Sequence, residues 1–526
     1  MKFSLLRGLR VFIALLIFLP LLFYFCDFLD IVPNGLKELA TIQLVPAVLA
    51  GSLVILLILF LLTLLFGRIY CSTICPLGVL QDIVSRFSGR GQKNKKGKKK
   101  HIFKYAKPQN YLRYGLLSIC VILPVLGIVT PLLLLDPYSN WGRIATNLLR
   151  PVGMLINNLI ASIATKSGNF SFYHVSIETV TTISLIAGII ALLVVGIMSF
   201  LRGRLYCNTI CPVGSLLGLV SRYSLFKVVM DENRCTKCTL CERACKSQCI
   251  DSKSIKIDSS RCVSCYNCLS RCKHGAIGYR FSWKNQKQKN PDVEINDVQQ
   301  SILTERDTRR KSRRAFMATG TAVVATIPFI PAWAQASEID ESKLTPVTPP
   351  GSKSLKHFKE KCTACHLCVT HCPQQILKPA GLSFGFGYLL KPHMVYEKAY
   401  CNYECDICSK VCPNGAILPV GEKKKTTQVG IAKFVQERCV VFNDETDCGA
   451  CSEHCPTQAV RMLPYKDGLR LPHVTPELCV GCGGCEYICP VRPVRAINVI
   501  ANEVHQVSKK PEEEEIEQIK VDDFGF

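Results

Sequence analysis

The stretch CVGCGGCEYICP, residues 479–490, decides how the second half of this sequence folds. Its cysteines are spaced C-x2-C-x2-C-x3-C, and proline follows the last of them. Three thiolates on one tight loop can grip a cubane iron–sulfur cluster, while the fourth, on the helix that follows, completes a neighbouring cluster. We therefore expect small α+β ferredoxin-like domains, each with a pair of 4Fe–4S clusters, wherever this spacing recurs.

The spacing recurs in three more groups of the second half, each ending in Cys-Pro. One group has an extra residue in its first gap, and another has a longer insertion there. Sixteen cysteines predict four clusters, and either neighbouring groups pair or the first pairs with the fourth around a central pair. The cysteines are Cys362, Cys365, Cys368, Cys372, Cys401, Cys405, Cys408, Cys412, Cys439, Cys448, Cys451, Cys455, Cys479, Cys482, Cys485 and Cys489.

Two further groups lie upstream and predict two more clusters, six in all. By the crossing rule, Cys272 completes the first cluster and Cys245 the second. Lysine replaces the usual proline after both of these cysteines. Zinc is the alternative for paired C-x2-C motifs, but eight cysteines in this register favour clusters. The cysteines are Cys235, Cys238, Cys241, Cys245, Cys262, Cys265, Cys268 and Cys272.

The composition indicates a chain divided between a membrane and water. It has 526 residues, is 48% hydrophobic and carries 64 Lys and Arg with a net charge of +24. Apolar stretches near 10–30, 44–67, 110–135 and 177–200 are each long enough to span a bilayer. Basic residues gather beside these stretches, above all at 86–107, as the positive-inside rule expects, so we do not expect nucleic-acid binding. The loop 136–176 predicts an interfacial helix or a helix packed on the bundle.

A fifth apolar segment, 315–334, follows Ser312-Arg313-Arg314 and precedes AWAQA at 332–336. This pattern is typical of a twin-arginine export signal, and a plain fifth span is the alternative. Both interpretations place residues 337–526 in the periplasm and residues 228–314 in the cytoplasm. Export of folded cargo suits clusters that are loaded in the cytoplasm, and it argues against disulfides as the role of these cysteines.

An internal repeat lies beside the membrane. GRIYCSTICPLG at 67–78 follows the second span and GRLYCNTICPVG at 203–214 follows the fourth. Symmetric halves often place a shared site at their interface. Cys71, Cys75, Cys207 and Cys211 match a complete ligand set and predict a seventh cluster, with reduced thiols as the alternative. Cys26, Cys120 and Cys249 remain outside every group.

These observations predict a membrane α-helical bundle of four spans plus a fifth signal-anchor span, joined to α+β ferredoxin-like domains. We expect a four-span membrane domain at 1–227, a cytoplasmic two-cluster domain at 228–282 and a linker with the signal at 283–336. A periplasmic four-cluster domain at 353–505 and an acidic tail at 506–526 complete the chain.

Residues 1–280 resemble the NapH type of membrane quinol-dehydrogenase subunit, which has four spans, two Cys-x3-Cys-Pro motifs and a cytoplasmic cluster pair. Residues 305–505 resemble the NapG and MauM type of exported four-cluster ferredoxin. The resemblance implies an inner-membrane electron conduit from quinol or a cytoplasmic donor to a periplasmic reductase or cytochrome subunit in anaerobic respiration. The alternatives are an accessory protein that keeps a periplasmic metalloenzyme active, or a redox sensor.

The chain is expected to act as an electron-transfer component and not as a stand-alone enzyme, since no flavin or nucleotide fingerprint is found. A hydrocarbon core of about 30 Å is too thick for one tunnelling step. A quinone, the seventh cluster or a haem subunit must therefore assist, and residues 136–143 are the candidate quinone site.

Overall fold

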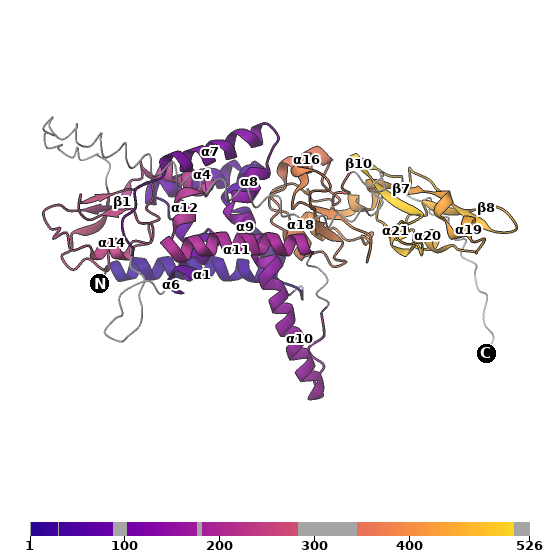
Figure 1. The fold of residues 1–526 in the computed structure, drawn as a ribbon, viewed down its shortest axis with the longest axis horizontal. Coiled ribbons are helices and arrows are strands. Elements are labelled where there is room, and N and C mark those ends of the chain that lie inside the picture. The colour runs from indigo at the N-terminus through magenta and orange to yellow at the C-terminus, as the bar shows by residue number, and fades with distance from the viewer. Residues whose placement is uncertain (1, 30, 88–102, 176–180, 282–344, 510–526) are drawn as a thin grey trace, which may run out of the picture. The chain divides into compact units, whose positions relative to one another are not determined.

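A computed structural model describes residues 2–29, 31–87, 103–175, 181–281 and 345–509 (Figure 1). The predicted twin-arginine segment, the fifth apolar stretch at 315–334 and the chain beyond residue 509 lie outside the described residues. The described residues before 282 and after 344 belong to one compact unit.

Three helices are long and apolar enough to cross a membrane: Leu5–Cys26, Pro137–Lys166 and Thr182–Arg202. The first lies in α1 (Lys2–Cys26) and the third is α11 (Thr182–Arg202), close to the predicted first and fourth spans. The second joins α9 (Pro137–Ile144), a π-helical turn (Ala145–Leu149) and α10 (Arg150–Lys166).

That long helix lies at 136–176, where we predicted an interfacial helix or a helix packed on the bundle, and its length and composition would also allow it to cross a membrane. Pro137 stands in the first turn of α9, where its missing N–H group leaves no hydrogen bond unmade. Pro151 follows the π-helical turn, and the wider turn accommodates a proline ring that would otherwise clash with a carbonyl one turn earlier. The helix therefore continues past both prolines.

The predicted second and third spans are each broken into two helices. Residues 44–67 form α3 (Leu44–Ala50) and α4 (Leu53–Phe66), separated at Gly51, which has a φ of 73°. Residues 110–135 form α7 (Asn110–Val125) and α8 (Thr130–Leu135), separated near Gly127, which has a φ of 80°. Glycine in the left-handed conformation ends helices, so α4 and α7 have only 14 and 16 residues.

Short helices carry the repeat and the turns around it. They are η1 (Asn34–Lys37), α2 (Glu38–Thr41), α5 (Tyr70–Thr73), α6 (Pro76–Phe87), α12 (Leu205–Thr209) and α13 (Pro212–Ser221).

The upstream cysteine groups lie in a small α+β domain. Strand β1 (Phe226–Met230) pairs antiparallel with β4 (Ile277–Phe281), with Val228 opposite Tyr279. Strand β2 (Ile250–Asp251) pairs with β3 (Lys256–Ile257), and α14 (Leu240–Ala244) follows the first cysteine loop.

The downstream groups lie in a larger α+β region built from antiparallel strand pairs. These pairs are β5 (Leu377–Pro379) with β6 (Pro392–Met394), β7 (Thr427–Phe434) with β10 (Ile497–Val507), and β8 (Val460–Pro464) with β9 (Arg470–Val474). The helices are α16 (Leu355–Lys361), α17 (Leu367–Thr370), η5 (Phe386–Tyr388), α18 (Ile407–Val411), η6 (Gly421–Thr426), η7 (Gln436–Arg438), α19 (Val440–Asn443), α20 (Ala450–Glu453) and α21 (Gly484–Ile488).

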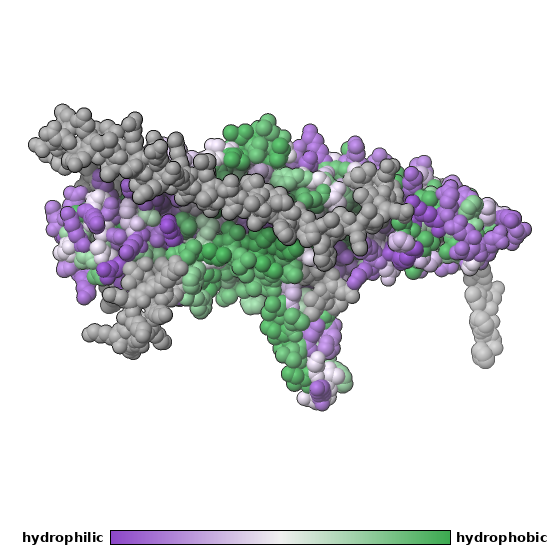
Figure 2. Space-filling view, viewed as in Figure 1, coloured by the Kyte–Doolittle hydropathy of each residue, from purple (hydrophilic) through white to green (hydrophobic). Residues whose placement is uncertain are grey.

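Large apolar side chains are exposed along the long helices. Leu5, Phe12 and Phe23 of α1 are 61–72% exposed. Figure 2 shows hydrophobic residues gathered over α1, α11 and α10, whereas hydrophilic residues dominate the parts that carry β1 and β8. An apolar surface of this extent marks contact with lipid or with another protein.

Candidate iron–sulfur sites

The two Cys-x3-Cys-Pro motifs meet in the buried centre of the helical region. Cys71 lies in α5 and Cys207 in α12, while Cys75 and Cys211 directly precede the prolines that begin α6 and α13. All four side chains are at most 3% exposed. Burial raises the pKa of Cys75 well above its usual range, and the neighbouring thiols of Cys207 and Cys71 raise it further. The thiols from the two halves therefore face one another, and they form what we call the repeat site.

Two arginines connect the halves reciprocally. Arg68 Nη2 donates to the carbonyl oxygen of Cys207 at 3.0 Å, and Arg204 Nη1 donates to that of Cys71 at 2.6 Å. Both guanidinium groups are at most 1% exposed. Arg68 Nε and Arg204 Nη2 are buried donors without a hydrogen-bond partner among the described residues. A negatively charged cluster would supply acceptors for such donors, so the repeat site fits this cofactor.

Glycine makes the tight packing within each copy of the repeat feasible, where the helix after Cys-Pro lies against the backbone of the first cysteine. A Cβ atom on Gly78 would lie 2.3 Å from the carbonyl oxygen of Cys71, and one on Gly214 would lie 2.2 Å from that of Cys207. No side chain fits at such distances, which explains why both copies of the repeat have glycine three residues after the second cysteine.

One carboxylate balances the charge beside the repeat site. Asp82 accepts from Arg204 Nε at 2.8 Å, and Arg10 and Lys246 approach its other oxygen at 3.1 Å. Burial alone would raise the pKa of Asp82, but these three cations outweigh burial and hold it well below its usual range. The site keeps an excess of positive charge, which favours an anionic cluster.

The repeat site also contacts the upstream cysteine domain. Arg68 Nη1 donates to the carbonyl oxygen of Ser260 at 3.0 Å, and Asn208 Nδ2 donates to that of Ser247 at 3.1 Å. Ser247 lies two residues after Cys245, and Ser260 lies two residues before Cys262. The backbone of the upstream cluster loops is therefore held directly on the repeat site.

The predicted cluster cysteines converge in sets of four. Four cavities, with volumes of about 320 to 370 Å³ when their open mouths are included, are each lined by three cysteines of one group and the last cysteine of its neighbour. These sets are Cys235, Cys238, Cys241 with Cys272; Cys362, Cys365, Cys368 with Cys412; Cys401, Cys405, Cys408 with Cys372; and Cys439, Cys448, Cys451 with Cys489.

In each of the two remaining sets, the neighbouring thiols raise the pKa of one cysteine, which indicates that these sulfurs lie close together. Burial raises the pKa of Cys268, and Cys265, Cys262 and Cys245 raise it further. Burial likewise raises the pKa of Cys485, and Cys482, Cys479 and Cys455 raise it further. In the downstream region neighbouring groups therefore pair, which is one of the two arrangements that the sequence left open.

No three His, Cys, Asp or Glu side chains of the described ranges converge closely enough to hold a single metal ion. A cubane differs from a single ion because its own iron and sulfide atoms separate the thiolates. The four-cysteine cavities have room for such atoms between the sulfurs.

The helix α9 joins the repeat site to the first downstream cavity, and sequence reasoning missed this contact. Residues 136–143, the candidate quinone site, are buried, and all but the N-cap Asp136 are helical. Asn140 Nδ2 donates to the Tyr206 hydroxyl at 3.1 Å, beside Cys207. On the same helix a Cβ on Gly142 would lie 2.3 Å from the carbonyl oxygen of Cys365. The aromatic and small residues of DPYSNWGR were the available signal for tight packing.

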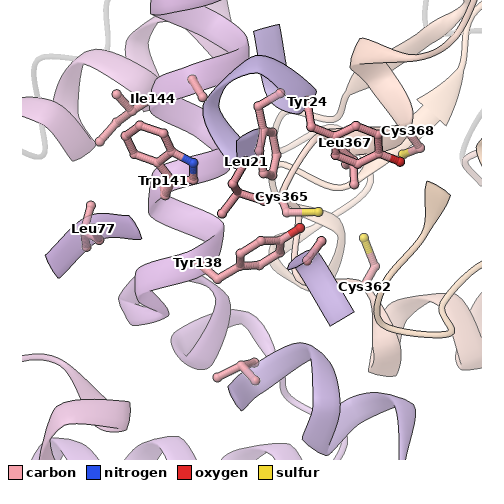
Figure 3. Packing of buried hydrophobic residues seen from close by; sticks show 14 of the residues in the cluster. Leu21, Tyr24, Leu77, Tyr138, Trp141, Ile144, Cys362, Cys365, Leu367 and Cys368 are labelled. Atoms are coloured by element: carbon pink, nitrogen blue, oxygen red, sulfur yellow. The ribbon is translucent and has the colours of Figure 1, made fainter. Parts of the chain in front are cut away.

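Aromatic side chains surround this contact. Figure 3 shows Tyr138 directing its hydroxyl toward Cys365, with Tyr24 and Trp141 nearby. The Tyr138 hydroxyl is buried without a hydrogen-bond partner among the described residues, so a cluster sulfide there would supply its acceptor. The nearby Arg150 Nη2 donates to the carbonyl oxygen of Thr370 at 3.0 Å and fixes the downstream domain on the helices.

The cysteines outside the groups have different surroundings. Cys26 and Cys120 lie in α1 and α7 and contribute to packing. Cys249 is 1% exposed, and its sulfur lies 3.5 Å from that of Cys245. Its position beside a cluster set was not predicted.

Comparison with known families indicates iron–sulfur binding in three parts of the chain. A family model described as a 4Fe-4S binding domain matches residues 48–95 and 184–229, which include both copies of the repeat. A 4Fe-4S dicluster domain matches residues 446–492, and another 4Fe-4S binding domain matches residues 355–378. No solved structure matches the chain.

Several characterised relatives are ferredoxin-type proteins. The methylamine utilization ferredoxin-type protein MauM of Methylobacillus flagellatus is 31% identical over 166 residues, 30% of this chain and 70% of that protein. The ferredoxin-type protein NapG of Escherichia coli is 34% identical over 162 residues, 29% of this chain and 69% of that protein. MauM of Methylophilus methylotrophus is 30% identical over 209 residues, 38% of this chain and 90% of that protein.

Proposed function

Because the chain belongs to the family of ferredoxin-type 4Fe–4S proteins, we propose that it conducts electrons across the inner membrane to a periplasmic reductase. Iron–sulfur electron transfer follows from the family itself. The proposed additions are the membrane span, a quinol or cytoplasmic donor, and the periplasmic acceptor. The observation that carries them is the position of the repeat site, which contacts the upstream cluster domain on one side and, through α9, the downstream domain on the other.

The six sets of four cysteines, four of which line cavities, are the proposed ligands of six 4Fe–4S clusters. Each set combines three cysteines of one loop with one from the paired group, which is the ligand arrangement of two-cluster ferredoxins. A bound cubane supplies one-electron storage at each position. The chain's own contribution is to fix the distances between positions and to set the local charge.

The repeat site is the proposed position of a seventh cluster. Four buried thiols, two buried arginines with unused donors and a match to a 4Fe-4S family model over both motifs support this assignment. Its buried position divides the path across the helices into shorter steps. A single step across a hydrocarbon core of about 30 Å would otherwise be required.

The proposed topology follows the charge of the sequence. Arg7 and Arg10 at the start of α1 and Arg202 at the end of α11 are expected on the cytoplasmic side, together with residues 228–314. Residues 337–526 are expected in the periplasm after export through the twin-arginine segment. In this arrangement α9 lies near the outer surface, where residues 136–143 connect the repeat site to the first periplasmic set.

The test uses purified full-length protein in liposomes with a quinol analogue and EPR detection of each cluster. Replacing Cys71 and Cys207 by serine is expected to remove about four iron atoms per chain. Reduction of the downstream clusters should slow, while the upstream pair keeps its signal. Replacing Cys120 by serine is the matched control, because this buried cysteine belongs to no set.

Unchanged iron in the double variant would contradict the seventh cluster. Unchanged reduction of the downstream clusters, despite the loss of iron, would contradict the route through the repeat site. If quinol reduces no cluster in the unmodified protein, quinol is not the donor.

A further inference from the structure

A cavity separate from all cysteine sets lies between the start of α1, the end of α6 and the upstream cluster domain. Its volume is about 850 Å³ when the open mouth is included. Six cations line it, together with Ser85, Phe103, Ala244 and Asn267, and none of its described lining residues is acidic. The cations are Arg7, Arg10, Arg86, Arg243, Lys246 and Arg271.

Protein carboxylates leave most of this charge unbalanced. Asp82 is the one described carboxylate that pairs with lining residues, and it divides its oxygens among Arg10, Lys246 and Arg204 of the repeat site. Arg7, Arg86 and Arg271 form no ion pair with any residue that the structure describes, and the same holds for Arg243. A cavity with this excess of positive charge attracts an anion.

Two of the cations are held in place by burial. Arg10 is 6% exposed and Lys246 is 8% exposed. Arg10 Nε has no hydrogen-bond partner among the described residues. Buried cations with unused donors are costly unless a ligand completes their hydrogen bonds, so the cavity is a formed site as well as a charged surface.

Apolar side chains beside the cavity indicate which kind of anion fits. Ile83 and Phe87 of α6 are 38% and 78% exposed. They belong to the helix that supplies the lining residues Ser85 and Arg86. The ligand that matches both surfaces has an anionic head and apolar chains.

We propose that the cavity binds the phosphate headgroup of an anionic phospholipid, with the acyl chains along the exposed apolar residues of α6. Basic pockets at the membrane surface recognise anionic lipid heads in this way. The proposal does not depend on the electron route, because it rests on residues outside every cysteine set.

The test measures lipid retained by the full-length protein. Protein purified in mild detergent is transferred to nanodiscs containing either phosphatidylglycerol or phosphatidylcholine, and bound lipid is counted by native mass spectrometry. Replacing Arg7 and Arg86 by glutamine should weaken retention of phosphatidylglycerol roughly thirtyfold at low salt, the effect of two lost cations. Replacing both by lysine should preserve retention.

The matched control replaces Lys253 and Lys256 by glutamine. These are two exposed cations of the upstream cluster domain that do not line the cavity. This control should retain phosphatidylglycerol fully, and iron content should be unchanged in all variants. Equal retention of both lipids by the unmodified protein, or equal retention by the glutamine variant, would overturn the proposal. Displacement of the lipid by millimolar inorganic phosphate alone would also overturn it, because the site would then be one for a soluble anion.

Discussion

Replacing Gly214 by alanine tests the tight packing within the second copy of the repeat and its contact with Arg68 of the first copy. The new Cβ would lie 2.2 Å from the carbonyl oxygen of Cys207 and 2.8 Å from Arg68 Nη2. Ordinary contact begins near 3.4 Å, so α13 must retreat from this backbone by about 1.2 Å. Because the opposing atom belongs to the backbone, a change of side-chain rotamer cannot relieve the contact.

The expected loss of stability is the net result of contributions of opposite sign to the free energy of unfolding. Overpacking at a rigid contact costs about 1–3 kcal/mol, and a weakened hydrogen bond from Arg68 costs about 1.5–3 kcal/mol more. The higher helix propensity of alanine returns about 1 kcal/mol. We therefore expect a net destabilisation of roughly 2–5 kcal/mol.

Replacing Gly196 by alanine is the control. This glycine lies inside α11 and has no atom within 4 Å of the Cβ position, so alanine should be neutral or stabilising. Thermal unfolding in detergent and iron per chain are measured for both variants. The reasoning is refuted if the Gly214 variant unfolds at the same temperature as the control and retains the same iron.

Two further predictions concern charge. Replacing Asp82 by asparagine leaves three buried cations without their carboxylate and should destabilise the protein by about 3–5 kcal/mol, measured by thermal unfolding. Replacing Asp467, which is 79% exposed, is the control and should have little effect in the same experiment. Burial lowers the pKa of His393 and His505 to about 4. Since the unfolded state takes up these protons near pH 6.5, stability should be complete above that pH and fall toward pH 4, by up to about 3 kcal/mol for each histidine. Glutamine at both positions should flatten this dependence in denaturant unfolding, and an unchanged slope would contradict the assignment.

The cysteine positions were predictable because cluster ligation imposes a fixed spacing on one local loop. The pairing of Cys372 with the Cys401 group could not be predicted, because it depends on how separate loops pack. The membrane spans were also harder to predict, for a related reason. Hydropathy measures composition over a window, so it could not detect that Gly51 ends a helix or that a π-helical turn carries α10 past Pro151.

The contact of α9 with Cys365 could not be predicted from local pattern. It joins residues more than 200 positions apart, and its local sequence, DPYSNWGR, has the polar character of a loop. Burial of Asn140 and Arg143 becomes favourable only because Tyr206 and the carbonyl oxygen of Leu133 supply hydrogen bonds from other elements.

The reciprocal arginines impose an order on biosynthesis. Arg68 leaves the ribosome long before its acceptors, the carbonyl oxygens of Cys207 and Ser260, have been made. The first copy of the repeat must therefore wait, as an open half-site with two thiols, until translation has passed residue 260. The seventh cluster proposed there would need all four thiols, so it could be inserted only after the second half has folded against the first. Any truncation upstream of this point leaves reactive cysteines without their partners, and such products are expected to be substrates for membrane quality control.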